Sequence, residues 1–131
     1  MKLRLGISLE TDEGIRFFGQ GPYQIMQEVD RLHSLRAAAQ EMGMAYSKAF
    51  HLIRQAETAL GFPLCQRTVG GKGGGGSALT KQAKELLRRY EAYRAACDRM
   101  AEQLYQEHFS GFLPQASSNY RGKGTGQDHP D

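Results

Sequence analysis

Two residue types that often organise small proteins are scarce in this chain of 131 residues, which has no tryptophan and two cysteines. Neither Cys65 nor Cys97 belongs to a Cys-x-x-Cys pair, and the four histidines show no ligand spacing around them. We therefore expect two reduced thiols in a cytoplasmic protein, and neither a metal site nor a cofactor.

Long hydrophobic runs are also missing. No stretch approaches the roughly 18–20 apolar residues that a membrane span requires, and residues 1–5 alternate in a way unlike a signal peptide. Hydrophobic content of 40% and charged content of 24% are ordinary for a soluble globular protein. The sequence predicts one domain with a modest core and no membrane partner.

Catalytic groupings are absent as well. The chain shows no paired carboxylates, no metal-ligand spacing and no nucleophile beside a base. We therefore expect that it is not an enzyme.

Acidic residues are lacking between Gly61 and Lys84, where Arg67, Lys72, Lys81 and Lys84 occur without a single Asp or Glu. The formal net charge is only +3. A local positive patch attracts phosphate more than such a small total implies, so this segment favours a nucleic-acid partner.

Glycine, in contrast, is concentrated in the same segment. Lys72 is the only large side chain within a run of six glycines, which are Gly70, Gly71, Gly73, Gly74, Gly75 and Gly76. Such a loop lets its backbone N–H groups approach another molecule closely, as expected of a wing that contacts DNA.

Three other interpretations of the glycine run compete with a DNA-contacting wing. A flexible linker is disfavoured by the strand-like residues before it and the helix start after it. A nucleotide phosphate loop needs Ser or Thr after its Lys, whereas Gly73 follows Lys72. The third interpretation, an inert hairpin tip, is not excluded, although it does not explain the basic residues on either side of the glycine run.

Apolar periodicity predicts the surrounding elements. Alternation over residues 2–10, a turn at 11–14 with Gly14 left-handed, and residues 15–18 predict a hairpin. Three helices are expected, from Pro22 to His33, from a Ser34 cap to Gly43, and from about Ala45 to Leu60. Residues 64–69 and 77–79 are the expected wing strands.

Thr80 caps a final helix over residues 81–108, which would extend roughly 42 Å. One monomer cannot cover its apolar stripe, so we expect it to pair with the same helix of a second copy. The residues predicted at this dimer interface are Leu86, Tyr90, Tyr93, Cys97, Met100 and Leu104. A polar composition predicts that residues 111–131 form a disordered tail.

The predicted fold class is mainly α with small β: a winged helix-turn-helix with an N-terminal β-hairpin and a long C-terminal dimerisation helix. The expected boundaries are 1–20 for the hairpin, 21–80 for the DNA-binding domain, 81–110 for the long helix and 111–131 for the tail.

A helix-turn-helix is indicated by Ala39, which stands four residues before Gly43. The small residue lets two helices approach, and the glycine permits the turn between them. Because the N-terminal part of a recognition helix contacts base edges, Ser47, Lys48 and His51 are the expected base readers. Tyr46 either anchors a phosphate or packs.

A solvated helix face is the competing interpretation, and it is favoured for Gln55 and Thr58. The full predicted DNA-binding set is Tyr46, Ser47, Lys48, His51, Arg54, Arg67, Gly70, Gly71, Lys72, Gly73, Gly74 and Lys81.

Residues 22–87 resemble the N-terminal DNA-binding domain of the ModE family of molybdenum-dependent regulators, a LysR-like winged helix-turn-helix. The resemblance rests on the segments 37–39, 42–44, 46–49, 70–76 and 79–80, together with Arg67. It implies a homodimer that binds a palindromic operator in double-stranded DNA.

Two departures from the ModE pattern stand out. Ala45 and Phe50 occupy positions where the family commonly has Ser and Trp, and Ala is a poor N-cap. ModE proteins also continue into domains that bind molybdate, whereas a polar tail is expected here, so the resemblance assigns no molybdate ligand to this chain.

A second hypothesis is a winged-helix protein-interaction module that docks a separate effector-sensing partner. Absence of any salt-dependent affinity for DNA would favour it.

Overall fold

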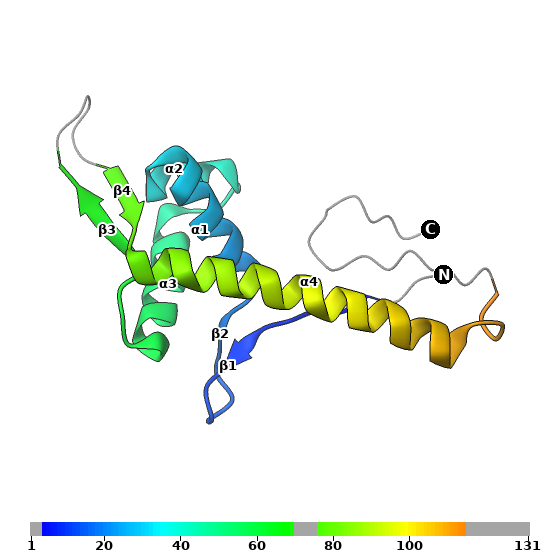
Figure 1. Ribbon diagram of the computed structural model, residues 1–131. Coiled ribbons are helices and arrows are strands. Elements are labelled where there is room, and N and C mark those ends of the chain that lie inside the picture. The colour runs from blue at the N-terminus through cyan, green and yellow to red at the C-terminus, as the bar shows by residue number, and fades with distance from the viewer. Residues whose placement is uncertain (1–3, 70–75, 115–131) are drawn as a thin grey trace. The chain divides into compact units, whose positions relative to one another are not determined.

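The computed structural model describes residues 4–69 and 76–114 (Figure 1). The chain divides into two compact units, one of residues 8–88 and one of residues 1–7 with 89–131. The described part is mainly helical with two small β-hairpins, which confirms the predicted fold class. The predicted tail beyond residue 114 lies outside the described residues.

The N-terminal hairpin pairs β1 (Leu9–Glu10) antiparallel with β2 (Arg16–Phe18). Its turn has Gly14 at φ 91°, the left-handed conformation that the sequence predicts. The first strand is much shorter than the alternation over residues 2–10 predicts. The short partner strand pairs with Leu9 and Glu10 alone, and an alternating pattern forms no ladder without a partner.

Three helices build the core of the larger unit: α1 (Gln20–Leu32), α2 (Leu35–Glu41) and α3 (Tyr46–Leu60). Each contacts the other two. Their buried side chains follow the helical spacing of the sequence. The fully or almost fully buried ones are Ile25, Met26, Val29, Ala38, Ala39, Ala49, Ile53 and Ala56.

The helix boundaries are set by local signals. The hydroxyl of Ser34 accepts a 2.9 Å hydrogen bond from the Ala37 N–H and caps α2. Gly43 has φ 69° in the turn between α2 and α3, and Gly61 has φ 85° where α3 ends. Glycine adopts these positive angles without steric cost, which fixes both helix ends.

A second hairpin pairs β3 (Cys65–Thr68) with β4 (Gly76–Leu79), in register from Cys65 opposite Leu79 to Thr68 opposite Gly76. Figure 1 shows this hairpin extending beyond the three helices. Its base is held by Thr80, whose hydroxyl donates to the Pro63 carbonyl at 2.7 Å and accepts from the Ala83 N–H at 3.0 Å. Thr80 thereby caps the next helix, as predicted.

The last helix, α4, runs over Lys81–Phe109. Ala83 and Leu87 are buried in the larger unit. In the other unit, the buried Tyr90 donates its hydroxyl to the Ile7 carbonyl at 3.0 Å. No helix within the described residues is long and apolar enough to cross a membrane.

Gly76 of β4 lies in a sterically restricted position. A Cβ at this position would overlap the backbone carbonyl oxygen of His33. We predict that Gly76→Ala lowers the free energy of unfolding by about 1–3 kcal/mol, because the start of β4 must move away from the His33 carbonyl. Urea denaturation followed by circular dichroism measures this change.

Gly21→Ala is the matched control, since a Cβ at Gly21 meets no atom within 4 Å. It should change the unfolding free energy by less than about 1 kcal/mol. Equal stabilities for the two variants would contradict the close approach of β4 to His33.

Candidate nucleic-acid interface

The outward face of α3 carries the predicted base readers. Ser47, Lys48, His51 and Arg54 are all exposed, while Ala49 and Ile53 on the opposite side are buried. Ala45 lies before the helix in an extended conformation and makes no side-chain capping bond, in agreement with its poor capping ability. The arrangement leaves the first two turns of α3 accessible to a partner.

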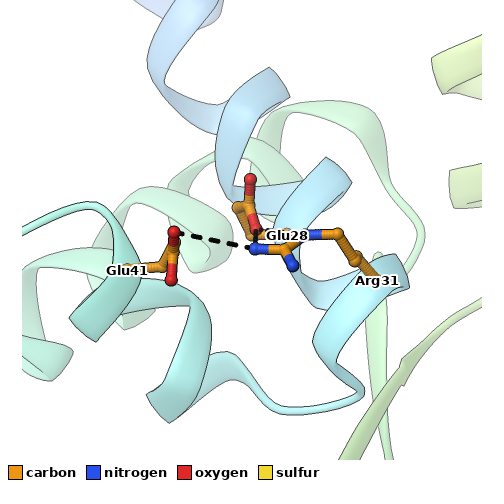
Figure 2. A network of polar contacts seen from close by, with 3 residues as sticks. All are labelled: Glu28, Arg31 and Glu41. Carbon is orange, nitrogen blue, oxygen red and sulfur yellow. Dashed lines mark hydrogen bonds and ion pairs between the residues drawn. The ribbon is translucent and has the colours of Figure 1, made fainter.

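The basic side chains of the larger unit differ in their partners. Within the described part of the chain, the side chains of Lys48, His51 and Arg67 have no hydrogen bond or ion pair. Arg31 instead contacts Glu28 at 2.5 Å and Glu41 at 3.7 Å, as Figure 2 shows. Lys48 and Arg67 therefore remain available to an anionic ligand.

The wing strand β3 presents Arg67 as an exposed side chain opposite Ser77 of β4. Lys81 is exposed at the start of α4. The predicted contacts at Gly70, Gly71, Lys72, Gly73 and Gly74 lie outside the described residues.

Ser77 attaches the wing to the helices. Its N–H donates to the His33 carbonyl at 3.0 Å, and its hydroxyl accepts from the Leu35 N–H at 3.3 Å. His33 has φ 59° at the end of α1, and its N–H donates to the Val29 carbonyl. These bonds fix β4 against the first turn of α2.

Glu57 attaches the other end of the wing to α3. Its carboxylate accepts from the N–H groups of Leu64 at 2.7 Å and Cys65 at 3.4 Å. It also pairs with Arg54 across 3.7 Å. Burial, with a smaller contribution from the negative charge of Glu57, raises the pKa of the Cys65 thiol to about 11.

Aromatic and guanidinium groups stack along one side of α3. The Arg36 guanidinium carbon lies 4.2 Å from the centre of the Tyr46 ring. The centres of the Tyr46 and Phe50 rings are 6.0 Å apart, and the Arg54 guanidinium carbon lies 5.6 Å from the centre of the Phe50 ring. We call these four residues the α3 stack.

The α3 stack lines one wall of a groove of about 710 Å³, and Arg67 and Ser77 lie on the wing wall. Three arginines, Arg36, Arg54 and Arg67, line the groove, against one carboxylate, Glu57. Sequence reasoning missed Arg36 and Phe50. The place of these two residues in the groove depends on contacts between α2, α3 and the wing, which no local sequence pattern indicates.

The predicted dimer residues differ in exposure. Tyr93, Met100 and Leu104 are 60%, 57% and 47% exposed. Leu86 and Cys97 are half-buried, while Tyr90 is buried within the chain. The three exposed residues recur at a spacing of 7 and 4 positions, which places them along one side of α4.

Comparison with known proteins agrees with this geometry. Residues 23–84 match the family described as bacterial regulatory helix-turn-helix protein, lysR family. These residues are similar to a LysR-type helix-turn-helix domain. The match is to a family of DNA-binding regulators rather than to an enzyme family.

Several relatives carry ModE in their names. The chain is 29% identical over 102 residues to the molybdenum transport protein ModE of Azotobacter vinelandii, covering 75% of this chain and 37% of that protein. It is 32% identical over 68 residues to the transcriptional regulator ModE of Haemophilus influenzae, covering 52% of this chain and 27% of that protein.

A third relative is the molybdenum-pterin-binding protein MopB of Rhodobacter capsulatus, 32% identical over 54% of this chain and 26% of that protein. The chain thus spans well under half the length of these relatives. The resemblance to the ModE N-terminal DNA-binding domain is consistent with these matches.

The Cys65 thiol should be poorly reactive in the folded protein. A pKa of about 11 leaves roughly 100-fold less thiolate at pH 8 than the ordinary value near 9. In a Cys97→Ser variant, alkylation by iodoacetamide should therefore be about 100-fold slower in buffer than in urea. The native rate should keep rising to about pH 11, and equal rates in buffer and urea would contradict the burial of this thiol.

Proposed function

We propose that the chain is a sequence-specific transcriptional regulator of the ModE N-terminal type that binds a palindromic operator as a homodimer. The observation that supports this most is the set of exposed cations without acidic partners on α3 and β3 of a LysR-type helix-turn-helix domain. Nucleic acid is the anionic ligand that such a domain takes.

In this proposal α3 enters the major groove with its first two turns. Lys48 donates to guanine O6 and N7, and Ser47 and His51 contact neighbouring base edges. Arg67, Lys72 and the N–H groups of the glycine run contact the backbone or the minor groove. Lys81 supplies a further phosphate contact.

Dimerisation is assigned to α4. Tyr93, Met100 and Leu104 expose a stripe of large apolar side chains, and burying them against a second copy is favourable. A twofold dimer presents two copies of α3, so the operator should be an inverted repeat with half-sites about 34–36 Å apart or a multiple of that spacing.

Selection of bound duplexes from a random DNA pool by the purified chain tests this function. The proposal expects an enriched inverted repeat. Parallel selections with molybdate and with tungstate would show whether either anion alters binding. No enrichment under any condition would overturn the proposal and favour a module that docks a separate sensing partner.

Substitutions of Lys48 and Lys72 should weaken binding to the selected duplex in different ways. We predict that Lys48→Ala weakens specific binding by about 5- to 150-fold and random-sequence binding much less, because it removes a base contact worth about 1–3 kcal/mol. Lys72→Ala should weaken both and flatten the slope of log K against log salt by about one unit. Fluorescence anisotropy across a salt series measures both quantities.

Arg31→Gln is the matched control, because Arg31 is an exposed arginine already paired with Glu28 and Glu41. It should leave affinity and salt slope unchanged. Equal losses on specific and random DNA for Lys48→Ala would contradict its assignment as a base reader.

The dimer interface on α4 can be tested separately from DNA binding. Met100→Glu combined with Leu104→Glu should raise the dimer dissociation constant by more than about 100-fold, since unpaired carboxylates are costly to bury. Sedimentation velocity should show monomers at concentrations where the parent chain is dimeric. Ala95→Glu, an exposed position on the other side of α4, should leave the dimer intact, and an unchanged dimer in the double variant would refute this interface.

A further inference from the structure

The groove between α2, α3 and the wing contains Arg36, a cation to which the proposed function assigns no role. Arg36 lies in the first turn of α2, is exposed, and places its guanidinium 4.2 Å from the centre of the Tyr46 ring. Within the described part of the chain, this ring contact is the only interaction of the Arg36 side chain, which has no hydrogen bond or carboxylate partner.

The position of Arg36 is fixed from two sides. The Leu35 N–H donates to Ser77 Oγ, which holds the start of α2 against β4. The Tyr46 ring holds the far end of the side chain against α3. A guanidinium that uses one flat face on an aromatic ring keeps its N–H edges available for hydrogen bonds to an anion.

The charge of the groove is suited to a polyanion. Arg36, Arg54 and Arg67 line it, and its one carboxylate, Glu57, is already occupied by two backbone N–H groups and by Arg54. The groove is also open, lying between the helix that presents Lys48 and the wing strand that presents Arg67.

We propose that this groove seats one sugar-phosphate strand of the DNA, and that Arg36, oriented by stacking on Tyr46, is its phosphate anchor. The proposal rests on the proposed DNA-binding function and adds Arg36 as a contact residue and Tyr46 as a positioning residue. The half-exposed Phe50 ring, next along the α3 stack, supplies an apolar wall beside the deoxyribose.

The test measures affinity of the full chain for the selected duplex and for a random duplex across a salt series. Arg36→Gln should weaken both by about 5- to 10-fold at moderate salt and reduce the salt slope by about one unit, the signature of one lost phosphate contact. Arg31→Gln, an arginine paired with two glutamates, should bind like the parent.

Tyr46 separates positioning from direct contact. Tyr46→Phe keeps the ring and should bind within about twofold of the parent, whereas Tyr46→Leu should lose as much as Arg36→Gln. The double variant Arg36→Gln with Tyr46→Leu should be no weaker than either single variant, because both remove the same contact. A loss in Tyr46→Phe equal to that in Tyr46→Leu would show a hydroxyl contact and overturn the positioning role.

Each failure has its own signature. A chain that binds no DNA overturns the proposed function together with this inference. A chain that binds DNA, with Arg36→Gln keeping the parent affinity and salt slope while Lys48→Ala loses specificity, overturns the phosphate anchor alone. If Tyr46→Leu unfolds in a thermal melt, the Arg36→Gln and Tyr46→Phe results still decide both points.

Discussion

The two hydrogen bonds of Ser77 are the constraint on which the candidate interface depends. They join β4 to the His33 carbonyl and the Leu35 N–H, so the wing, the end of α1 and the start of α2 form one connected surface. Gly76 is needed beside them because a larger residue would meet the His33 carbonyl. Glu57 provides the matching attachment between α3 and the other wing strand. With both ends held, the groove between α3 and the wing has defined walls.

Charge pairing divides the surface of the larger unit into two kinds. Arg31 and Arg88 are neutralised by nearby glutamates on the same or an adjoining helix. Arg36, Lys48 and Arg67 have no such partner among the described residues. An unpaired cation lowers the stability of the free protein little, because water solvates it. The same cation strengthens binding when it displaces counterions from DNA. The domain therefore needs no large net charge to bind a polyanion.

Local signals in the sequence were enough to predict much of this fold. Ser34 and Thr80 cap helices and Gly43 turns the chain because each acts on backbone groups only a few residues away. The groove could not be predicted in the same way. The Leu35–Ser77 bond joins residues 42 positions apart, and the Arg36–Tyr46 stack depends on how two helices meet. The residue-level contacts to DNA and to a second copy stay predictions.

Mapping the bound DNA on the protein by amide NMR tests the central claim most directly. The full chain, labelled with ¹⁵N, would be titrated with its selected duplex. The account predicts the largest shifts at the start of α2, in the first two turns of α3 and along β3 and β4. Shifts confined to the Glu28–Arg31 region of α1, or to α4 beyond Tyr90, would contradict it, because the DNA would then contact a surface other than the groove and the recognition helix.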